Sequence, residues 1–520
     1  MSKNIVQEIL ETIEAQNNPT YFRDFNGRLY ITFERNGKII TTNIKSEQSR
    51  SLIISTVFEN RLGRLSSNAI ESTLDEMYSK AFTSEIVKKV NNRTGKTNTS
   101  EVVVDLGDNG FCIINEHGYQ IKNSVDIPFH RPNKMVSLPL PKSVSLSEFL
   151  GKFKSLFNFE LPDNYLLALA FILKSYLTDS GAYVILVLQG SQGVGKTTSS
   201  NNIKKMIDPT CPLLFSPPSC QNDLLTIAHS SHLLAFDNIS YINAEMADYF
   251  CRLSTGGGVI KRGLYTDDEE RSYDIMRPML FNGIDELTGR ADFLDRAVVI
   301  TLKKLLDQNR KSESKLKESF DKDYPYLMGG IFTLLSLVLK ELPNVREENL
   351  PRMTEFARIG IAMEKVLKLE EGSFLTTYRN NINEKSENAF WSDDVCSSIH
   401  SALTKQFDKE ENPEGIKGTL SDIRNLLKGS SMGKGDKFQI AKSSRSFRGH
   451  LTRVEPLLNS KGIIVLKRRT AKAREIEIRF TDEKLESLRR VERGEEIELE
   501  KDSFMITKKE GQPTHDIDYL

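Results

Sequence analysis

The sequence predicts an α/β core with a parallel sheet, preceded by a small α+β domain and followed by helices and a small C-terminal domain. From Ser145 to about Lys304, helical patterns alternate with short apolar strands, which is typical of parallel sheets. A glycine-rich segment directly follows one of these strands, and two further strands end in polar residues. Before this region, short strands alternate in polarity around hairpin turns, and after it the pattern is helical.

The composition excludes several classes of protein. The chain has 520 residues, of which 38% are hydrophobic, so it is long enough for about three domains with their own cores. Its five cysteines lack paired metal-ligand spacing, which predicts free thiols in the reducing cytoplasm. The charged N-terminus lacks the apolar centre of a secretory signal, and the apolar stretch 327–339 is too short to span a bilayer. We therefore expect a cytoplasmic protein without a membrane partner.

The formal net charge is zero, but the positive charge is unevenly distributed. Between Lys434 and Arg479 there are thirteen Lys and Arg residues against four Asp and Glu residues. A charge run is often only a solvated face, yet an excess confined to one expected domain favours contact with a polyanion.

Residues 1–143 are expected to form the α+β domain and its connector. The stretch 20–44 alternates apolar and polar residues around two Asn-Gly pairs, which are strong signals for hairpins. Strands at 102–106 and 111–114 flank another such turn. With a helix expected near 69–90, these elements make a small α+β domain.

The glycine-rich segment lies in the core, which we expect at residues 144–310. It reads GSQGVGKT and follows the apolar run 182–188, in the order strand, loop, helix that is typical of phosphate-binding loops. Glycines let the backbone N–H groups converge on phosphates, the lysine supplies a positive charge, and the next hydroxyl offers a ligand to Mg²⁺. ATP and Mg²⁺ are therefore the expected cofactors. The residues expected to bind them are Gly190, Gly193, Gly195, Lys196, Thr197 and Thr198.

A phosphate-binding loop needs an acidic residue at the end of a neighbouring strand to hold Mg²⁺. Asp237 follows such a strand and is expected beside Thr197, although an aspartate there can also cap the next helix. Asn238 stands where many such ATPases carry a glutamate. Because an amide cannot accept a proton as a carboxylate does, either Asn238 orients the attacking water or another acid is the base.

The third strand of this series ends at Asn282, which we expect to hydrogen-bond the γ-phosphate or the attacking water. Beyond it, Arg290 and Arg296 bracket a turn that contains Asp292 and Asp295. A guanidinium is suited to stabilise transition-state charge in the site of a neighbouring subunit. The alternative for each arginine is an ordinary ion pair with one of the two aspartates.

The remaining chain is expected to form a helical lid (311–410), a winged helix (411–482) and a charged tail (483–520) that is mobile. In the winged helix, four apolar residues recur at helical spacing and bury one face of a helix. The apolar residues are Phe447, Leu451, Val454 and Leu458. The basic residues expected to contact DNA are Arg445, Arg448 and Arg453 on this helix and Lys467, Arg468, Arg469, Lys472 and Arg474 in the following hairpin.

The motifs GSQGVGKT, LLAFDNIS, LSTGGGVIKRGLYTDDEE, RPMLFNGID and RADFLDRA follow one another in this order. Together they resemble the AAA+ ATPases of phages and bacterial mobile elements, which include the pathogenicity-island Rep proteins and the cassette-chromosome helicases. These proteins are related to superfamily 3 and minichromosome-maintenance helicases. The similarity extends from about Val102 to about Phe480, and it implies an AAA+ P-loop ATPase core.

The resemblance also implies roles for single residues. It makes Lys196 and Thr197 the Walker A pair, Asp237 the Walker B acid, Asn282 sensor 1, either Arg296 or Arg290 the arginine finger, and Arg352 the sensor 2 of the lid. Related helicases project a hairpin into a central channel just before sensor 1. Lys261 and Arg262 are then the candidates for gripping a phosphate backbone, although the acidic turn 266–270 disfavours DNA at the tip. An intersubunit role for both is the alternative.

These features favour an ATP-dependent DNA helicase and replication initiator of a mobile genetic element. If an arginine acts in trans, head-to-tail interfaces close a homo-oligomeric ring, expected to be a hexamer. Single-stranded DNA in the channel and duplex origin DNA at the winged helix are the expected partners. Two other functions fit the same motifs: an ATP-dependent helicase loader or origin remodeller, and a nucleotide-switched DNA-binding regulator.

Overall fold

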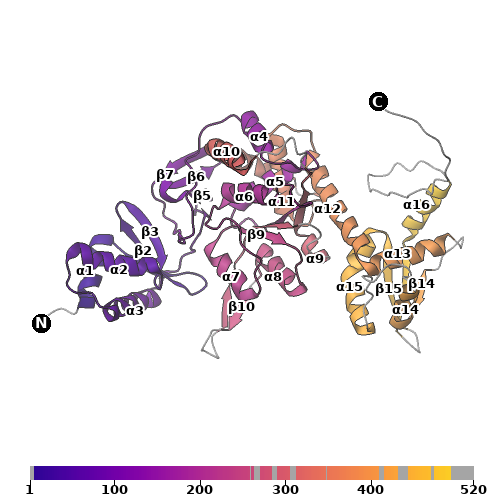
Figure 1. The fold of residues 1–520 in the computed structure, drawn as a ribbon, viewed down its shortest axis with the longest axis horizontal. Coiled ribbons are helices and arrows are strands. Elements are labelled where there is room, and N and C mark those ends of the chain that lie inside the picture. Colours follow the sequence, from indigo (N-terminus) through magenta and orange to yellow (C-terminus); the bar gives the residue numbers. More distant parts are fainter. Residues whose placement is uncertain are drawn as a thin grey trace. The chain divides into compact units, whose positions relative to one another are not determined.

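The computed structural model describes residues 5–257, 259–262, 270–273, 275–283, 290–304, 312–346, 348–408, 415–430, 443–469 and 474–493. The chain divides into two compact units, Met1–Lys385 and Ser386–Leu520. Each unit is described by itself (Figure 1).

The first unit begins with a small α+β domain, as predicted. Its three antiparallel strands, in the order β1-β2-β3, are joined at the two expected turns. Asn36 and Gly37 between β2 and β3 both have positive φ, +53° and +71°, which is the conformation that a two-residue hairpin turn requires. The elements are α1 (Ile5–Asn17), β1 (Thr20–Arg23), β2 (Leu29–Arg35), β3 (Lys38–Asn43), α2 (Glu47–Asn60) and α3 (Ser67–Thr83).

A second antiparallel sheet, in the order β4-β5-β6-β7, follows this domain in the chain. It comprises β4 (Thr94–Lys96), β5 (Val102–Asp105), β6 (Phe111–Asn115) and β7 (Gly118–Lys122), with the 3₁₀ helix η1 (Gly107–Asn109) in the expected turn. Val102 and Val104 pack into the main hydrophobic core, whereas Val103 packs into a small cluster on the other face. The expected domain boundary at residue 143 therefore falls inside a region that shares one core, because this sheet is buried on both faces.

Four parallel strands form the central sheet, in the order β13-β8-β12-β9. The three expected apolar runs are the strands β8 (Ile185–Gln189), β9 (Leu234–Ile239) and β12 (Met279–Gly283), and the fourth strand is β13 (Ala297–Thr301). Because the strands are parallel, their carboxyl ends share one edge of the sheet and their amino ends share the other. The register aligns Leu188 with Asn282 and Gln189 with Thr301 at the carboxyl edge.

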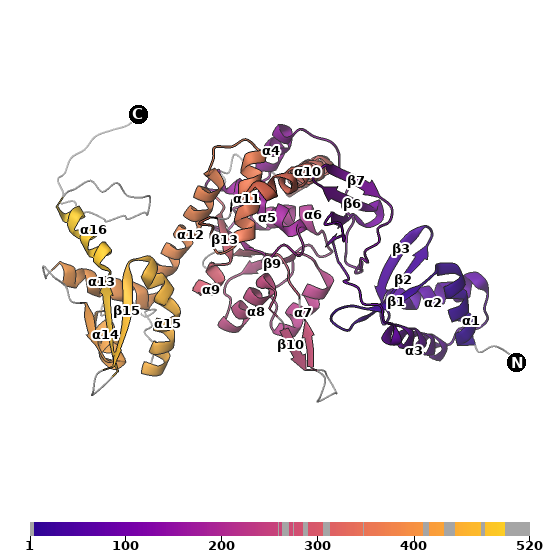
Figure 2. The same ribbon diagram turned by 180° about the vertical axis from the view of Figure 1, so that it is seen from behind.

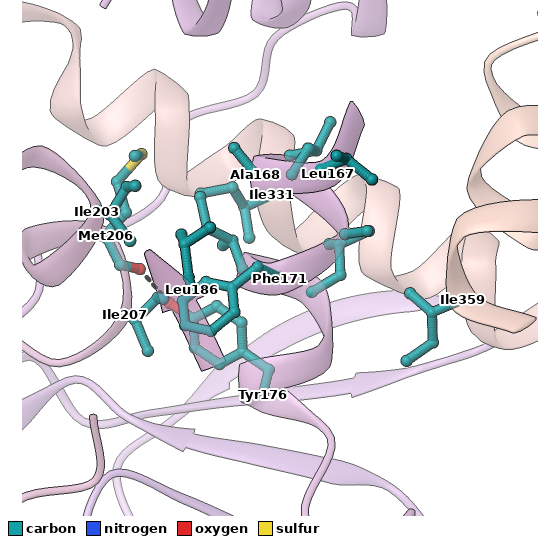
Figure 3. Close-up of a cluster of buried hydrophobic side chains, with 14 of the residues drawn as sticks. Leu167, Ala168, Phe171, Tyr176, Leu186, Ile203, Met206, Ile207, Ile331 and Ile359 are labelled. Carbon is teal, nitrogen blue, oxygen red and sulfur yellow. Dashed lines mark hydrogen bonds between the residues drawn. The ribbon is translucent and has the colours of Figure 1, made fainter. Parts of the chain in front are cut away.

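Helices cover both faces of this sheet (Figures 1 and 2). Successive side chains of β8 point to opposite faces of the sheet. Leu186 packs into the apolar cluster on one face, and Val187 packs into the cluster on the other. Figure 3 shows the larger cluster, where side chains of α5, α6, α10 and α11 surround Leu186. The hydroxyl of Tyr176 donates to the carbonyl of Met206 within it. The helices and the remaining hairpin are α4 (Leu146–Lys154), α5 (Asn164–Tyr176), α6 (Lys196–Ile207), α7 (Gln221–Ser230), α8 (Ala244–Thr255), β10 (Val259–Arg262), β11 (Glu270–Tyr273) and α9 (Ala291–Leu294).

The expected lid is not a separate layer. The long helices α10 (Glu313–Glu341) and α11 (Thr354–Val366) pack in the same apolar cluster as α5. Among the described residues, Glu313–Asn344 is the one helical segment that is long and apolar enough to cross a membrane by length and composition. Its residues Leu327 and Ile331 are fully buried in the core, as predicted for a buried helix. The helix α12 (Ser373–Ser392), which follows the 3₁₀ helix η3 (Leu342–Asn344) and α11, contains the boundary between the two units.

The second unit has the predicted order of two helices and a hairpin, together with a short third strand. Its antiparallel sheet has the order β14-β16-β15. The elements are α13 (Asp394–Phe407), β14 (Ile416–Gly418), α14 (Leu420–Ser430), α15 (Ser444–Ser460), β15 (Ile463–Arg469), β16 (Arg474–Phe480) and α16 (Asp482–Glu492). The tail was expected to be mobile beyond residue 482, but the structure continues it as α16, which Thr481 caps by accepting from the backbone N–H of Lys484.

Candidate nucleotide-binding site

The glycine-rich loop joins the carboxyl end of β8 to the first turn of α6, as the motif predicted. Gly190, Gly193 and Gly195 have φ values of +144°, +80° and +84°, which side-chain-bearing residues rarely adopt. A Cβ atom at Gly190 would lie 2.8 Å from the carbonyl oxygen of Leu302, so the loop also needs glycine there for space. Successive positive φ values turn backbone N–H groups toward a common centre, which suits an anion.

The Lys196 ammonium lies across this loop. Its Nζ donates to the carbonyl oxygens of Gly190 at 2.6 Å and Ser191 at 2.8 Å. Lys196 is also the first residue of α6, at the positive end of the helix dipole. The loop therefore combines a mobile side-chain cation with fixed backbone donors.

The structure brings Thr197 and Asp237 together. The Thr197 hydroxyl donates to Oδ1 of Asp237 at 3.1 Å, so two oxygen ligands from different elements meet beside the loop. Oxygen donors are those that Mg²⁺ prefers, and Mg²⁺ usually keeps several waters, so two protein ligands suffice. The residues present fit Mg²⁺, which when bound would neutralise phosphate charge at this point.

Asn282 is buried and bridges two elements. Its Oδ1 accepts from the backbone N–H of Asn238 at 2.8 Å, and its Nδ2 donates to Oγ of Ser200 at 2.9 Å. The end of β9 is thereby tied to α6 through the neighbouring strand β12. Asn282 lies at the edge where it was expected, but its amide holds protein groups in position.

Asn238 has a conformational reason to be asparagine. Its φ is +55°, and the pairing of β9 with β12 shifts register here, between Phe281 and Gly283. Asparagine adopts left-handed backbone conformations several-fold more often than most residues, glutamate included. The absence of a glutamate after Asp237 is thus matched by a backbone that disfavours one.

Two residues that complete the loop's surroundings were missed in the sequence. Nδ2 of Asn158 donates to the carbonyl oxygens of Val194 at 3.0 Å and Lys303 at 2.7 Å, which ties the phosphate loop to the chain after β13. Ser200 accepts from Asn282, as described above. Neither residue belongs to a motif, so no local signal could have identified them.

A buried ionic cluster holds the other end of α6. The carboxylate of Asp208 accepts from Nε of Arg93 at 3.0 Å and from Nζ of Lys204 at 2.9 Å. Burial alone would raise the pKa of Asp208, but the two cations lower it well below its usual value. Burial lowers the pKa of Lys204 to about 8. The cluster thus anchors the phosphate-loop helix α6 to Arg93, which directly precedes β4.

The predicted trans-acting arginines lie away from the loop of their own chain. Arg296 immediately precedes β13, and its carbonyl accepts from the N–H of Ile185 at the amino end of β8. Its guanidinium donates to the carbonyl of Asp292 at 2.6 Å and pairs with the carboxylate of that residue. Arg290 instead pairs with Asp248 of α8 at 2.6 Å. Both arginines thus form ion pairs within the subunit.

Arg352, the expected sensor 2, forms ion pairs near the amino edge of the sheet. Its guanidinium pairs with Asp295 at 3.0 Å and Asp292 at 3.5 Å, beside the start of β13. From there, the five residues of β13 lead to the carboxyl edge, a distance on the order of 15 Å. In this structure, Arg352 therefore lies nearer to the amino edge than to the phosphate loop of its own subunit. Chain order suggested the role, but it does not determine the sheet edge.

Comparison with known proteins now agrees with this geometry. Residues 150–388, which include the phosphate loop, Asp237, Asn282 and the three arginines, match the model of the actinomycete integrative conjugative element replication protein family. The segment is therefore similar to a replication protein of mobile elements. The predicted resemblance is thereby confirmed for just under half of the chain. No curated protein matches the sequence.

Several solved structures are similar to this chain, two of them over most of its length. The SCCmec type IV Cch, described as an active helicase, has 11% identity and a TM-score of 0.43, covering 90% of this chain and 94% of its own. The C-terminal region of NrS-1 has 10% identity and a TM-score of 0.36, covering 92% and 98%. The JCV helicase has 14% identity and a TM-score of 0.23, covering 46% and 65%.

Within residues 150–388, the structure contains the hairpin that was expected to meet DNA. Its strands β10 and β11 pair antiparallel, with Lys261 opposite Arg271 and Arg262 opposite Glu270. The side chains of Lys261 and Arg262, and the acidic turn between the strands, lie outside the described residues.

Beyond this segment, α15 has the predicted amphipathic arrangement. Phe447 and Leu458 are fully buried and Leu451 and Val454 nearly so, while Arg445, Arg448 and Arg453 are exposed on the opposite side. Lys467 is exposed and lies 3.4 Å from a carboxylate oxygen of Glu455. The side chains of Arg468, Arg469 and Arg474, and the whole of Lys472, lie outside the described residues.

Proposed function

We propose that this protein is an ATP-dependent DNA helicase and replication initiator of a mobile element, with an AAA+ core acting in a homo-oligomeric ring. The observation that carries the proposal is the contact between Thr197 and Asp237 beside a loop of positive-φ glycines at the carboxyl edge of a parallel sheet. That arrangement binds a nucleoside triphosphate with Mg²⁺. The match of residues 150–388 to a replication-protein family supports the biological context.

In this proposal, the phosphates replace the loop carbonyls as partners of the Lys196 ammonium. The N–H groups of the loop hold the β- and γ-phosphates, and Thr197 and Asp237 hold Mg²⁺. Asn282 keeps the N–H of Asn238 in place, so the end of β9 stays aligned with the γ-phosphate. Asn238 then orients the attacking water rather than taking its proton.

The arginines complete the site of a neighbouring subunit. Arg296 is largely buried, and its Nε–H has no hydrogen-bond partner among the described residues. A γ-phosphate bound by another subunit would compete with Asp292 for the N–H donors of Arg296. These donors would then stabilise the negative charge that develops on the phosphate in the transition state. Such a contact joins two different faces of the protein, and repeated head-to-tail contacts close into a ring.

The exposed arginines of α15 supply duplex binding in the second unit. Helix, helix and hairpin with a basic outer helix face is the arrangement of a winged helix, whose recognition helix enters the major groove. Aromatic stacking residues are scarce on this surface, which favours phosphate and groove contacts over stacking on single strands.

Strand displacement tests the proposed activity. Purified protein, ATP and Mg²⁺ should unwind a forked duplex without any other helicase, and Lys196→Ala should not. ATP turnover without unwinding would indicate a loader or remodeller instead. DNA binding that depends on ATP but shows no turnover would indicate a nucleotide-switched regulator.

Duplex binding tests the role of α15. Replacing Arg445, Arg448 and Arg453 with alanine should weaken duplex binding and lower the log–log salt slope by about 0.9 for each DNA phosphate that the protein no longer neutralises. The matched control replaces Arg489, Arg490 and Arg493, which removes the same charge at α16. Equal weakening by the two triple variants would show a general charge effect and contradict the assignment.

A further inference from the structure

The first unit contains a cavity of about 710 Å³ that is separate from the phosphate loop. Its walls come from the turn after β1, from residues 89–94, which lead from α3 into the sheet β4–β7, and from the chain just before β8, β9 and β12. Tyr183, His232 and Arg277 lead into those three strands, so the cavity lies at the amino edge of the sheet. Ligand sites commonly form at such junctions between domains and have this size.

Arg277 is the decisive residue in the wall. Its Nε donates to the carbonyls of Ala228 at 2.9 Å and Ser231 at 3.0 Å, and its Nη1 donates to its neighbour Met276 at 3.0 Å. Among the described residues, no carboxylate forms an ion pair with it. Burial lowers the pKa of Arg277, yet a guanidinium stays charged at neutral pH.

The carboxylate that most attracts Arg277 is already occupied. Asp208 exerts that attraction from a distance, but it is bound by Arg93 and Lys204. Buried charges are normally paired, because an uncompensated one is costly to remove from water. The positive charge of Arg277 is therefore available to an anion in the cavity.

A second guanidinium lines the same space. Arg28 donates a hydrogen bond to the hydroxyl of Tyr30, and the charge of Arg277 also acts on that hydroxyl. Of the other charged groups in the wall, Lys89 and Asp179 neutralise each other in an ion pair. The Asp24 carboxylate accepts from the backbone N–H groups of Asn26 and Arg28, so it shapes the turn. Apart from the Lys89–Asp179 pair, the wall thus contains two guanidiniums, Arg277 and Arg28, and the carboxylate of Asp24, whose hydrogen bonds hold the turn.

Aromatic residues stand beside these cations. Phe25 lies on the turn after β1 with 74% of its surface exposed, although it borders the cavity. Tyr30 and Tyr183 are buried in the walls. An exposed aromatic ring beside guanidiniums is the pairing that binds a nucleotide, since the base stacks on the ring and the phosphate meets the cations.

The cavity also borders the base of the hairpin β10–β11. Thr255 and Gly256, at the end of α8, lead into the hairpin, and Ile275 and Met276 lead out of it toward β12. A ligand here would touch the N-terminal domain, the hairpin base and the segment that leads into β12.

We infer that this cavity binds a nucleotide unit, with its phosphate at Arg277 and Arg28 and its base on Phe25. The inference rests on the proposed function only for the expected source of that unit, a single DNA strand passing between the N-terminal domain and the core. A free nucleotide offers the same chemistry.

Fluorescence anisotropy with a labelled twenty-residue oligothymidylate tests the inference on the full-length protein. Phe25→Ala should weaken binding about fivefold or more, because stacking on one base contributes that much. Arg277→Gln should weaken it at least tenfold, and Arg277→Lys should fall between. The matched controls are Phe58→Ala, at an exposed ring of α2, and Arg64→Gln, at an exposed site outside the cavity; both should bind normally. Because Arg277 holds three carbonyls, the exposed Phe25 keeps the test valid if Arg277→Gln does not fold.

A second titration separates the sources. In a Lys196→Ala background, thymidine triphosphate should compete weakly with the oligothymidylate if the ligand is a strand, and tightly if the ligand is a free nucleotide. Either result supports binding in the cavity if Phe25→Ala reduces the competition. Unchanged affinity for both probes in folded Phe25→Ala and Arg277→Lys proteins overturns the inference. Basal ATP turnover should be normal in all cavity variants, so its absence from the wild-type protein would refute the proposed function alone.

Discussion

The two edges of the central sheet differ in how their charged and polar groups are satisfied. At the carboxyl edge, the phosphate loop, Thr197, Asp237 and Asn282 form one connected site within a single subunit. At the amino edge, Arg296 and Arg352 are paired with Asp292 and Asp295, and Arg277 has only carbonyl partners. The residues proposed to bind phosphate and Mg²⁺ at the first edge all come from one subunit. The second edge holds more guanidinium donors than its own carboxylates and carbonyls use.

Asp292 holds two arginines at the amino edge. Partial burial alone would raise the pKa of its carboxyl, but Arg296 and then Arg352 lower it below the usual value. One carboxylate therefore orients two arginines. A phosphate that binds Arg296 in the proposed ring would need to displace the Asp292 carboxylate, so one ion pair would replace another.

The largest expected effect is at the carboxyl edge. Lys196→Ala or Asp237→Ala should abolish ATP hydrolysis, because each removes a phosphate or Mg²⁺ ligand. The melting temperature should stay near that of the wild type, since neither side chain lies in the apolar core. Lys205→Ala on the same helix, where the lysine pairs with Asp321 at 3.7 Å, is the matched control and should hydrolyse ATP normally. Near-normal turnover in either site variant would refute the nucleotide site.

The next effect distinguishes the two edges. Arg296→Ala should bind ATP but hydrolyse it roughly a thousandfold more slowly, as expected for a finger supplied in trans. Mixed with Lys196→Ala, it should regain part of the activity, because hybrid interfaces contain one intact site. Arg290→Ala and Arg352→Ala are tested in the same way.

The outcome of mixing assigns the finger. Rescue with Arg290→Ala but not with Arg296→Ala would move the role to the arginine bound by Asp248. If none of the three variants is rescued in rings shown to contain both proteins, then the sites are not shared, and the amino edge serves stability alone.

Much of the carboxyl edge could be predicted because its residues occur in contiguous motifs. Strand, loop and helix order alone placed Thr197 beside Asp237. Ser200 and Asn158 could not be predicted, because their contacts arise only when distant segments pack. The apolar core extends across the boundary expected at residue 143, because β5 contributes to it. Its uninterrupted Val102–Val104 run is typical of a strand that is buried on both faces.

The amino edge was harder to predict because ion pairs depend on tertiary distance. The turn containing Asp292 and Asp295 suggested partners for Arg296, and one of them is correct. Arg352 was assigned from its place after the core, yet it lies 57 residues from Asp295 and still meets it. No role could be predicted for Arg277, because a single arginine before an apolar strand does not by itself indicate a binding site.

A smaller effect separates two roles of Asn238. If asparagine is present chiefly for its left-handed backbone, Asn238→Gly should retain most activity, whereas Asn238→Ala should be destabilised by roughly 1 kcal/mol. If the side chain orients water, both variants should lose turnover by at least about tenfold. ATPase rates and melting temperatures, measured together, decide between the roles. Ser200→Ala, which removes one partner of Asn282, serves as the control for indirect effects.

The smallest expected effect returns to the amino edge and concerns pH. Burial lowers the pKa of His232 to about 4, and its Nε2 lies 2.6 Å from the carbonyl oxygen of Ser175. The unfolded chain binds a proton near pH 6.5 whereas the folded chain does not, so this histidine reduces stability as pH falls from about 6.5 to about 4. Between pH 7 and pH 5.5 the reduction should be on the order of 1 kcal/mol. Melting curves of the wild type and His232→Gln should therefore converge on acidification, with the exposed His117→Gln as the control. A constant difference between the two curves would show that the pKa of His232 is the same in the folded and the unfolded chain, so that this residue makes no pH-dependent contribution to stability.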